Sequence, residues 1–275
     1  MQSASTEDIR ERCSISTIVF WGYAPVDEKA LGRIAQAGID RIELLESPEQ
    51  FDMADRDSMR GFAAMCRRAG VSIAAYHAHK VKPTGMGSGD LEKLTDACKR
   101  QIETLQEAGG DFWASHARMV DDSVFRLHEN LIRFVEGTRV RLGIENFIQP
   151  GLWVKDRLAF LKKLDHPQLG LLLDIGHVRD ESGRNPMTIP GGSADILDLC
   201  AGRLVHVHLH GFKDGVDHHP PLCQGDGIQW QELMRGLWKT DYRGYLNFES
   251  QGLPHHEGSI GKMGEMPEKI AAMLR

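Results

Sequence analysis

Several features are missing from this 275-residue sequence, and each absence narrows its function. No run of about 18 apolar residues occurs, so we expect no membrane-spanning helix and no membrane partner. The first 14 residues contain acidic side chains and no apolar stretch, which is not the pattern of a signal peptide. The five cysteines are scattered and none are at CxxC spacing, which disfavours a disulfide framework and a thiolate zinc site. We therefore expect a cytoplasmic protein with free thiols.

Basic residues and nucleotide-binding motifs are also lacking. The sequence has 33 Lys and Arg and 39 Asp and Glu, which gives a net charge of −6, so we expect no nucleic-acid partner. No GxGxxG motif follows the first apolar segment, and no GxxxxGK[ST] motif occurs, which disfavours dinucleotide and P-loop nucleotide binding. No linker or low-complexity stretch divides the chain. We expect one domain over residues 1–275, with residues 1–14 as a polar lead-in.

Apolar runs that end in ionisable side chains are the most informative feature present. The run LGLLLDIGH, Leu169–His177, is bounded by glycines and is typical of a strand buried on both faces, yet it contains Asp174 and His177. Three further runs, LGIENF, RLVHVHLHG and YLNFES, end in the same way. Burying an unpaired charge costs several kcal/mol, roughly, and pairing or metal binding is the usual remedy.

The order of these runs along the chain predicts the fold. Eight strand-like segments alternate with segments of helical period, which indicates parallel strands joined by crossover helices. Eight such units predict an α/β fold of the (β/α)8 TIM barrel type, and a doubly wound open sheet is the alternative. The expected strands span residues 16–22, 39–45, 71–77, 111–116, 142–147, 169–174, 204–209 and 244–249, and the last expected helix spans Ile260–Leu274.

The ionisable side chains fall at the expected carboxyl ends of the strands, where active sites of such barrels lie. They come from seven strands: Glu43, His77 with His79, His116, Glu145, Asp174 with His177, His208 with His210, and Glu249. Carboxylates gathered at one mouth repel one another, and a divalent cation removes that cost. Taken one at a time, His77, His79 and His116 fit an ordinary core or rim position as well as a functional one.

In these motifs, the chain resembles the xylose isomerase-like TIM-barrel superfamily of sugar isomerases and epimerases. The resemblance covers residues 15–275 and rests on AGIDRIEL, GIEN, LDIGH, HVHLH, QGDGIQW and YRGYLNFES. It implies that Glu145, Asp174, His208 and Glu249 are metal ligands. It also implies that His177 binds a substrate oxygen.

The implied chemistry is removal of a proton next to the carbonyl of a small sugar or keto-polyol. Glu145 and Glu249 form the expected acid–base pair, acting through an enediolate that one divalent ion stabilises. Oxygen-rich ligation with one imidazole suits Mn²⁺, Mg²⁺ or Co²⁺, with Zn²⁺ as a further option. We expect Glu43, His79 and Trp21 to contact substrate beside His177, and the resemblance suggests a homo-oligomer.

Alternative functions remain open at this point. A metal-dependent dehydratase of a keto-polyol would use a similar site, and a non-catalytic binding barrel is a third option. An endonuclease IV-like tri-zinc phosphodiesterase would add ligands such as His79, His116, Asp217 and His218 or His219. Ketose epimerases place an arginine six residues after the histidine ligand, where this chain has Asp214, so the resemblance does not identify the substrate.

Overall fold

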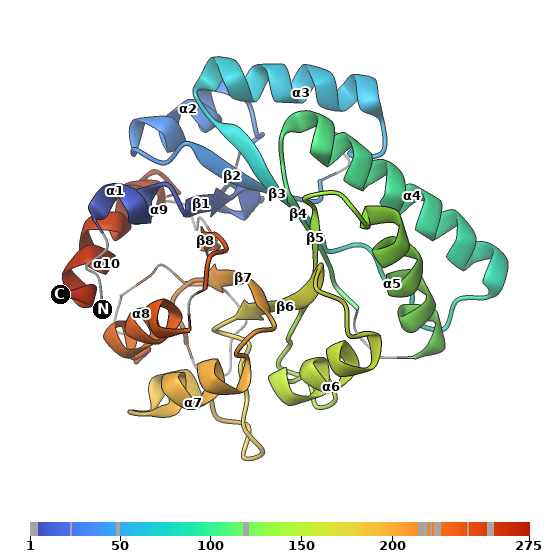
Figure 1. The fold of residues 1–275 in the computed structure, drawn as a ribbon. Coiled ribbons are helices and arrows are strands. Elements are labelled where there is room, and N and C mark those ends of the chain that lie inside the picture. The colour runs from blue at the N-terminus through green and yellow to red at the C-terminus, as the bar shows by residue number, and fades with distance from the viewer. Residues whose placement is uncertain are drawn as a thin grey trace.

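Eight parallel strands close into one barrel, which confirms the predicted (β/α)8 fold (Figure 1). The structure is a computed structural model of the whole chain. It describes residues 5–22, 24–47, 50–117, 121–213, 219–220, 222, 227–240, 242–251 and 256–275. Each strand pairs with the next in chain order, and the eighth pairs with the first.

The strands are short and almost entirely buried, as expected where helices cover a barrel. They are β1 (Cys13–Ser16), β2 (Arg41–Leu45), β3 (Ser72–Ala78), β4 (Phe112–Ser115), β5 (Arg141–Glu145), β6 (Leu169–Asp174), β7 (Leu204–Leu209) and β8 (Leu246–Phe248). Their register aligns Asp174 with His208, and His208 with Asn247. Residues from β6, β7 and β8 therefore share one level of the barrel.

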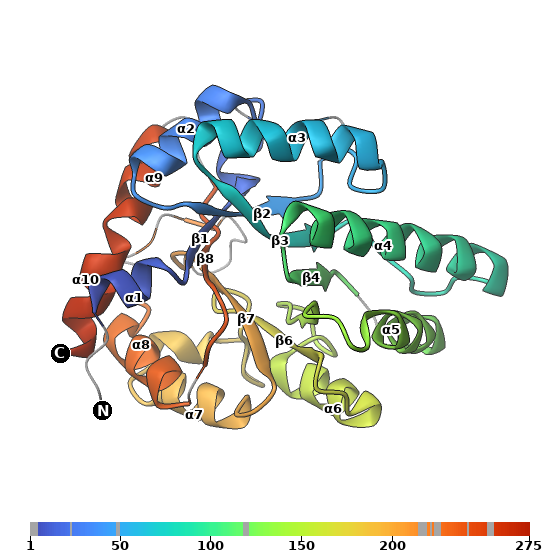
Figure 2. The same cartoon turned by 45° about the horizontal axis from the view of Figure 1, so that its top comes forward.

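Helices surround the barrel, as the two views show (Figures 1 and 2). They are α1 (Thr6–Arg10), α2 (Glu28–Gln36), α3 (Arg56–Ala69), α4 (Ser88–Ala108), α5 (Asp122–Val135), α6 (Val154–Leu164), α7 (Gly192–Leu199), α8 (Trp230–Lys239), α9 (His256–Gly264) and α10 (Met266–Leu274). Two 3₁₀ turns, Thr17–Phe20 and Pro186–Thr188, complete the described elements. Within the described ranges, no helix combines the length and apolar character needed to cross a bilayer.

Helix α3 shows how local sequence sets these elements. The Asp55 side chain accepts hydrogen bonds from the first free backbone N–H groups, which caps the amino end. Gly70 ends the helix in the left-handed region at φ +83°, a conformation that glycine adopts without steric cost. The face between these caps buries Met59, Phe62 and Cys66 toward the strands. Capping thus sets the length of the helix, and apolar periodicity sets its orientation.

The first strand and the last helix of the chain differ from the sequence-based expectation. The first strand is Cys13–Ser16, not residues 16–22, because the Ser16 side chain accepts from the N–H of Ile18 and begins a 3₁₀ turn. Part of the expected lead-in therefore belongs to α1 and β1, and α1 packs against α10. The expected single helix over Ile260–Leu274 is two helices, since Pro267 lacks an N–H group and lies in the first turn of α10.

Candidate active site

A cavity of about 400 Å³ opens at the carboxyl ends of the strands. Its lining combines acidic, imidazole, amide and aromatic side chains: Ile18, Trp21, Leu45, His77, His79, Lys82, His116, Glu145, Phe147, Gln149, His177, His219, Glu249 and Gln251. Five of the residues predicted to form the site are among them, namely Trp21, His79, Glu145, His177 and Glu249. This volume is large enough for a small ligand.

Beneath the cavity, the four predicted metal ligands converge on one imidazole nitrogen. Nδ1 of His208 lies 2.8 Å from Oε2 of Glu249 and 3.9 Å from an oxygen of both Glu145 and Asp174. All four side chains are at most 1% exposed. Among the described residues, Nδ1 of His208 and Oε2 of Glu249 have no hydrogen-bond partner. Unpartnered polar atoms at the centre of three carboxylates and an imidazole fit a divalent cation.

Glu43 orients the histidine of this group. Nε2–H of His208 donates to the Glu43 carboxylate at 3.2 Å, which directs Nδ1 toward the three other carboxylates. Asn247 donates to Glu43 at 2.8 Å, and the hydroxyl of Ser14 donates to Asn247 at 2.8 Å. A carboxylate behind a histidine is the arrangement that commonly fixes metal-binding imidazoles.

The predicted contact between Glu43 and substrate does not match this position. Glu43 is fully buried below the four-ligand group and does not line the cavity. Burial opposes ionisation of Glu43, but His208 and His206 outweigh it and lower the pKa of the carboxyl to about 2. The sequence showed a carboxylate at this strand but not its depth, because depth depends on the shear of the closed barrel.

Asp174 is held by its own turn and by an asparagine from the neighbouring strand. The backbone N–H of His177 donates to Oδ1 of Asp174 at 2.9 Å. Asn146 accepts from the N–H of Asp174 at 2.9 Å and donates to its carbonyl at 3.0 Å. Asn146 was missed as a site residue, although it follows Glu145 directly in the GIEN motif.

Glu145 is anchored from behind by a buried arginine. Nε of Arg157, on α6, donates to the Glu145 carbonyl at 2.7 Å, and its Nη2 donates to the Ala117 carbonyl. The Glu145 side chain faces His177, whose Nδ1 lies 3.3 Å away, and the Phe147 ring stacks on His177. Arg157 could not be predicted because nothing in a helical apolar pattern distinguishes it from an exposed arginine.

Electrostatic interactions keep both glutamates of the cavity ionised. Burial raises the pKa of each carboxyl, but neighbouring imidazoles outweigh this effect. His116 is the main cause for Glu145 and His208 is the main cause for Glu249, and both pKa values lie well below the ordinary range. Ionised carboxylates at neutral pH are the form required of a metal ligand or a general base.

His77 connects the two glutamates. Its Nε2 lies 3.1 Å from Glu145 and its Nδ1 lies 3.3 Å from Glu249. His116 approaches the same carboxylate, with Nε2 2.6 Å from Oε2 of Glu145. The structure thus groups His77 with His116 and Glu145 as possible ligands. The tri-zinc alternative had assigned this role to His79 instead, and the described ligand groups do not contain His79.

The remaining predicted residues lie at the rim or outside the described ranges. Trp21 is 52% exposed, and its ring centre lies 6.3 Å from that of His79. His219 approaches Glu249, with Nδ1 3.2 Å from Oε2. Asp214, Asp217 and His218 lie outside the residues that the structure describes.

Sequence comparison identifies the family of this barrel. The family model "Xylose isomerase-like TIM barrel" matches residues 31–270. The chain belongs to this family. Among curated proteins, the chain is similar to the 3-dehydroshikimate dehydratase of Pseudomonas putida. The two are 22% identical over 244 residues, which cover 85% of this chain and 35% of that protein. The chain matches only 35–55% of the length of its curated relatives.

Solved structures share this fold over nearly the whole chain. A D-tagatose 3-epimerase-like protein superposes with a TM-score of 0.75 at 18% identity, covering 96% of this chain and 98% of that one. A xylose isomerase-like TIM barrel protein from Mycobacterium smegmatis, in complex with magnesium, gives a TM-score of 0.73 at 16% identity and covers 98% of both chains. At these identities, the likeness shows the fold.

Proposed function

We propose that this protein is a divalent-metal-dependent isomerase or epimerase of a small sugar or keto-polyol. The observation that carries the proposal is the convergence of Glu145, Asp174 and Glu249 on Nδ1 of His208 beneath an open cavity. The epimerase-like and magnesium-bound proteins of the same fold support it by analogy.

The ligand set fits a hard or borderline cation. Three carboxylates and one imidazole suit Mn²⁺, Mg²⁺ or Co²⁺, and Zn²⁺ is also compatible. Such an ion, when bound, would polarise a substrate carbonyl and stabilise the charge of an enediolate. His208, fixed by Glu43, would supply the single nitrogen ligand.

The two glutamates at the cavity floor would move the proton. Both line the cavity and both are held ionised, so either can accept a proton from the carbon next to the carbonyl. For an isomerase, the glutamate that took the proton would return it to the neighbouring carbon. For an epimerase, the opposite glutamate would first take up a proton from solvent and would then deliver it to the other face, while the first glutamate releases its proton to solvent. His177 and His79, which also line the cavity, would orient substrate hydroxyls.

A dehydratase would use the same first step. After the proton is removed, loss of a hydroxyl from the next carbon needs a proton donor on that side, and a carboxyl protonated in the first step can serve. The sequence similarity to a 3-dehydroshikimate dehydratase favours keeping this reaction as a branch of the proposal.

A tri-zinc phosphodiesterase is the second candidate, and one observation favours it. His77, His116 and Glu145 form a second compact group of ligand atoms, which shares Glu145 with the four-ligand group. Metal-assisted phosphodiester cleavage uses ions held close together in this way. The net charge of −6 counts against a nucleic-acid substrate, because phosphate contacts require Lys and Arg.

Deuterium exchange separates these functions. We would incubate the Mn²⁺-loaded protein in D₂O with a panel of ketoses and keto-polyols and record deuterium next to the carbonyl by NMR. Uptake that chelation abolishes is the expected result. Absence of exchange throughout the panel, together with cleavage of bis-p-nitrophenyl phosphate, would reject the isomerase proposal in favour of the second candidate.

A further inference from the structure

One lysine lies among the residues that line the cavity above the proposed metal centre. Lys82 is the only lysine or arginine of the described lining, in which Glu145 and Glu249 are the only carboxylates. We propose that Lys82 binds a carboxylate group of the substrate, so that the sugar or keto-polyol is an acid. This inference rests on the proposed function and narrows its substrate class.

Lys82 has no counter-charge in the part of the protein that the structure describes. Within those ranges, no hydrogen bond or ion pair joins its side chain to another residue. The two carboxylates of the lining already lie against imidazoles, at 2.6 Å for Glu145 and 2.8 Å for Glu249. An ammonium group at a binding cavity without a protein carboxylate beside it can make charge-assisted hydrogen bonds to an anionic ligand.

The backbone around Lys82 is held in place, although its side chain is exposed. Val81 and Pro83 on either side are buried, and the proline ring fixes φ at that position. Further along the same segment, the N–H of Gly85 donates to the Asp121 carboxylate at 2.7 Å. The lysine therefore starts from a fixed position, and only its side chain has to be ordered when a ligand binds.

Two glutamines add hydrogen-bond donors to the same cavity. Gln149 and Gln251 line it, and neither side-chain amide is hydrogen-bonded within the described ranges. Their backbones are fixed, since the Gln149 carbonyl accepts from the N–H of Leu152 at 3.1 Å and the N–H of Gln251 donates to the His219 carbonyl at 3.0 Å. A carboxylate only accepts hydrogen bonds, so an ammonium group and two amides complement it.

The charge of the site favours a carboxylate over a phosphate ester. Glu145, Asp174 and Glu249 with one divalent ion would leave one net negative charge at the proposed centre. A carboxylate adds one negative charge, which one lysine balances, whereas a phosphate ester adds about two. The described lining also lacks arginine, the side chain that binds phosphate oxygens in pairs.

This assignment orients the substrate in the cavity. Glu145 and Glu249 are 1% exposed and lie at the floor, whereas the Lys82 side chain is exposed. The carbonyl would point to the floor and the carboxylate to Lys82, away from the reacting carbon. Lys82 would thus determine specificity, because binding of a remote group positions the reacting atoms.

The test compares two six-carbon probes that differ in one group. D-Gluconate carries a carboxylate where D-glucitol carries a hydroxymethyl group, and calorimetry of the Mg²⁺-loaded protein gives the affinity for each. We expect wild type to bind gluconate at least about 10-fold more tightly, as one charge-assisted hydrogen bond provides. Lys82→Met should lose this preference with glucitol affinity unchanged, and Lys82→Arg should keep most of it. Lys80→Met, which removes the same charge outside the described lining, should match wild type.

Four results would overturn the inference. Gluconate can bind a metal ion directly, and a preference that persists in Lys82→Met would assign it to the ion. Equal losses in Lys82→Met and Lys80→Met would assign the preference to general charge. No measurable binding of gluconate to wild type would reject the acid as substrate, and so would tighter Lys82-dependent binding of D-glucitol 6-phosphate.

The deuterium-exchange panel tests the proposed function separately. Metal-dependent exchange without a Lys82-dependent preference would overturn the substrate class and leave the function intact. A Lys82-dependent preference without exchange in any ketose, keto-polyol or keto acid would overturn the function and keep the carboxylate site. Circular dichroism and melting of each variant would show that a lost preference reflects a lost side chain and not unfolding.

Discussion

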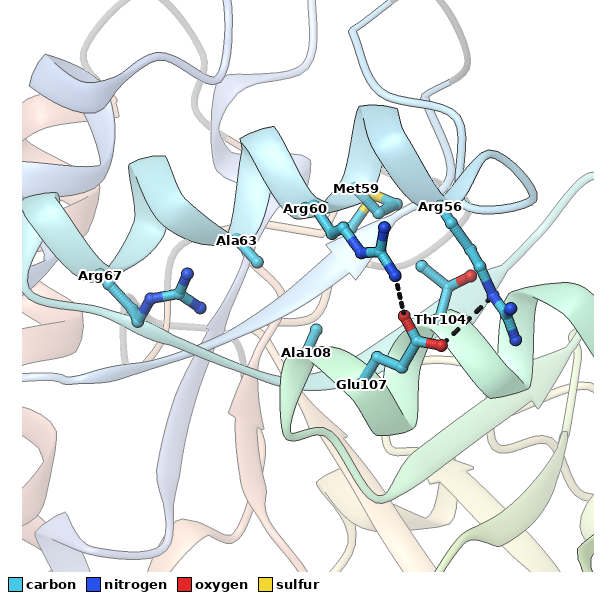
Figure 3. Close-up of a pocket in the computed structure, with 8 residues that line it drawn as sticks. All are labelled: Arg56, Met59, Arg60, Ala63, Arg67, Thr104, Glu107 and Ala108. Atoms are coloured by element: carbon cyan, nitrogen blue, oxygen red, sulfur yellow. Dashed lines mark ion pairs between the residues drawn. The ribbon is translucent and has the colours of Figure 1, made fainter.

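Two charged clusters of this protein look alike in sequence and differ in structure. One lies beneath the cavity at the barrel mouth, where Glu145, Asp174 and His208 are at most 1% exposed. The other lies on the outer surface, in a groove of about 190 Å³ between α3 and α4 (Figure 3). There Arg56 and Arg60 form ion pairs with Glu107 at 3.2 and 3.8 Å.

The difference is one of desolvation. The groove residues Arg56, Arg60 and Glu107 are 40–67% exposed, so water already solvates each charge and the ion pairs add little. At the barrel mouth, the buried carboxylates are solvated by imidazoles and asparagines instead, and some acceptors have no such partner. Clustered charge therefore indicates chemistry only where its burial is costly.

The largest expected effect comes from removing a carboxylate that faces the cavity. Glu249→Gln keeps the shape of the side chain but removes the charge that the proposed function requires of a metal ligand and proton acceptor. Once a substrate is found, we expect kcat to fall by about 10³-fold or more. Turnover measured with excess Mn²⁺ checks this, and Glu107→Gln in the outer groove is the matched control. An active Glu249→Gln enzyme would contradict the two-glutamate mechanism.

Removing the metal should lower the stability of the barrel. Without a cation, the repulsion among the mouth carboxylates is balanced only by histidines. An ion present at a thousand times its Kd stabilises the fold by about 4 kcal/mol, which shifts Tm by roughly 10 °C for a chain of this size. Melting with chelator, and then with Mn²⁺ restored, measures the shift. Identical melting curves would argue against a bound ion.

A smaller effect on metal binding is expected when Glu43, which holds the proposed ligand His208 in place, is changed. Glu43→Gln leaves His208 in place but weakens the interaction that fixes its tautomer and orientation. We expect the affinity for the proposed metal ion to fall roughly 10–100-fold, as for other outer partners of metal-binding histidines. Competition with a metal indicator measures this affinity. Glu103→Gln on exposed α4 should leave it unchanged, and equal affinities in both variants would remove Glu43 from this role.

Sequence patterns predicted the elements within the chain better than its first strand and its last helix. Strands β6 and β7 have the bounds that the sequence indicated, because apolar runs are strongest where elements are buried. Errors occur at β1, where a serine begins a 3₁₀ turn, and at Pro267, which divides the last helix. Both depend on single residues whose hydrogen bonding outweighs the apolar pattern.

The sequence allowed us to predict the proposed metal ligands of the candidate site but not the residues that support them. Parallel topology alone brings Glu145, Asp174, His208 and Glu249 to one end of the barrel. The support of His208 by Glu43 and Asn247 depends on strand register and on the depth of each side chain in the closed barrel. The approach of His210 to Asp174 depends on one missing Cβ atom, which no hydrophobic pattern indicates.

His128 provides a third case for this comparison. Its side chain is buried like those at the barrel mouth, but far fewer charged groups surround it. It lies fully buried on α5 and is bonded to the Val124 carbonyl and to Ser115, and burial lowers its pKa to about 4. Its folded pKa is below the unfolded value of 6.5, so its contribution is complete above pH 6.5 and declines as pH falls toward 4.

The measurement compares the pH dependence of two proteins. Between pH 7 and pH 5 we expect wild type to lose about 2 kcal/mol more unfolding free energy than His128→Gln, since each pH unit below 6.5 contributes about 1.4 kcal/mol. Urea denaturation at each pH gives these values. Parallel pH profiles would show that His128 titrates normally in the fold.

The smallest effect is expected in the outer groove. Glu107→Gln removes the carboxylate shared by Arg56 and Arg60, but all three side chains remain hydrated. The free energy of unfolding should change by less than about 1 kcal/mol, and the change should diminish in 1 M salt, where exposed charges are screened. Urea denaturation at low and high salt tests this. A salt-independent loss above that size would mean that the groove is desolvated, and the contrast with the barrel mouth would then fail.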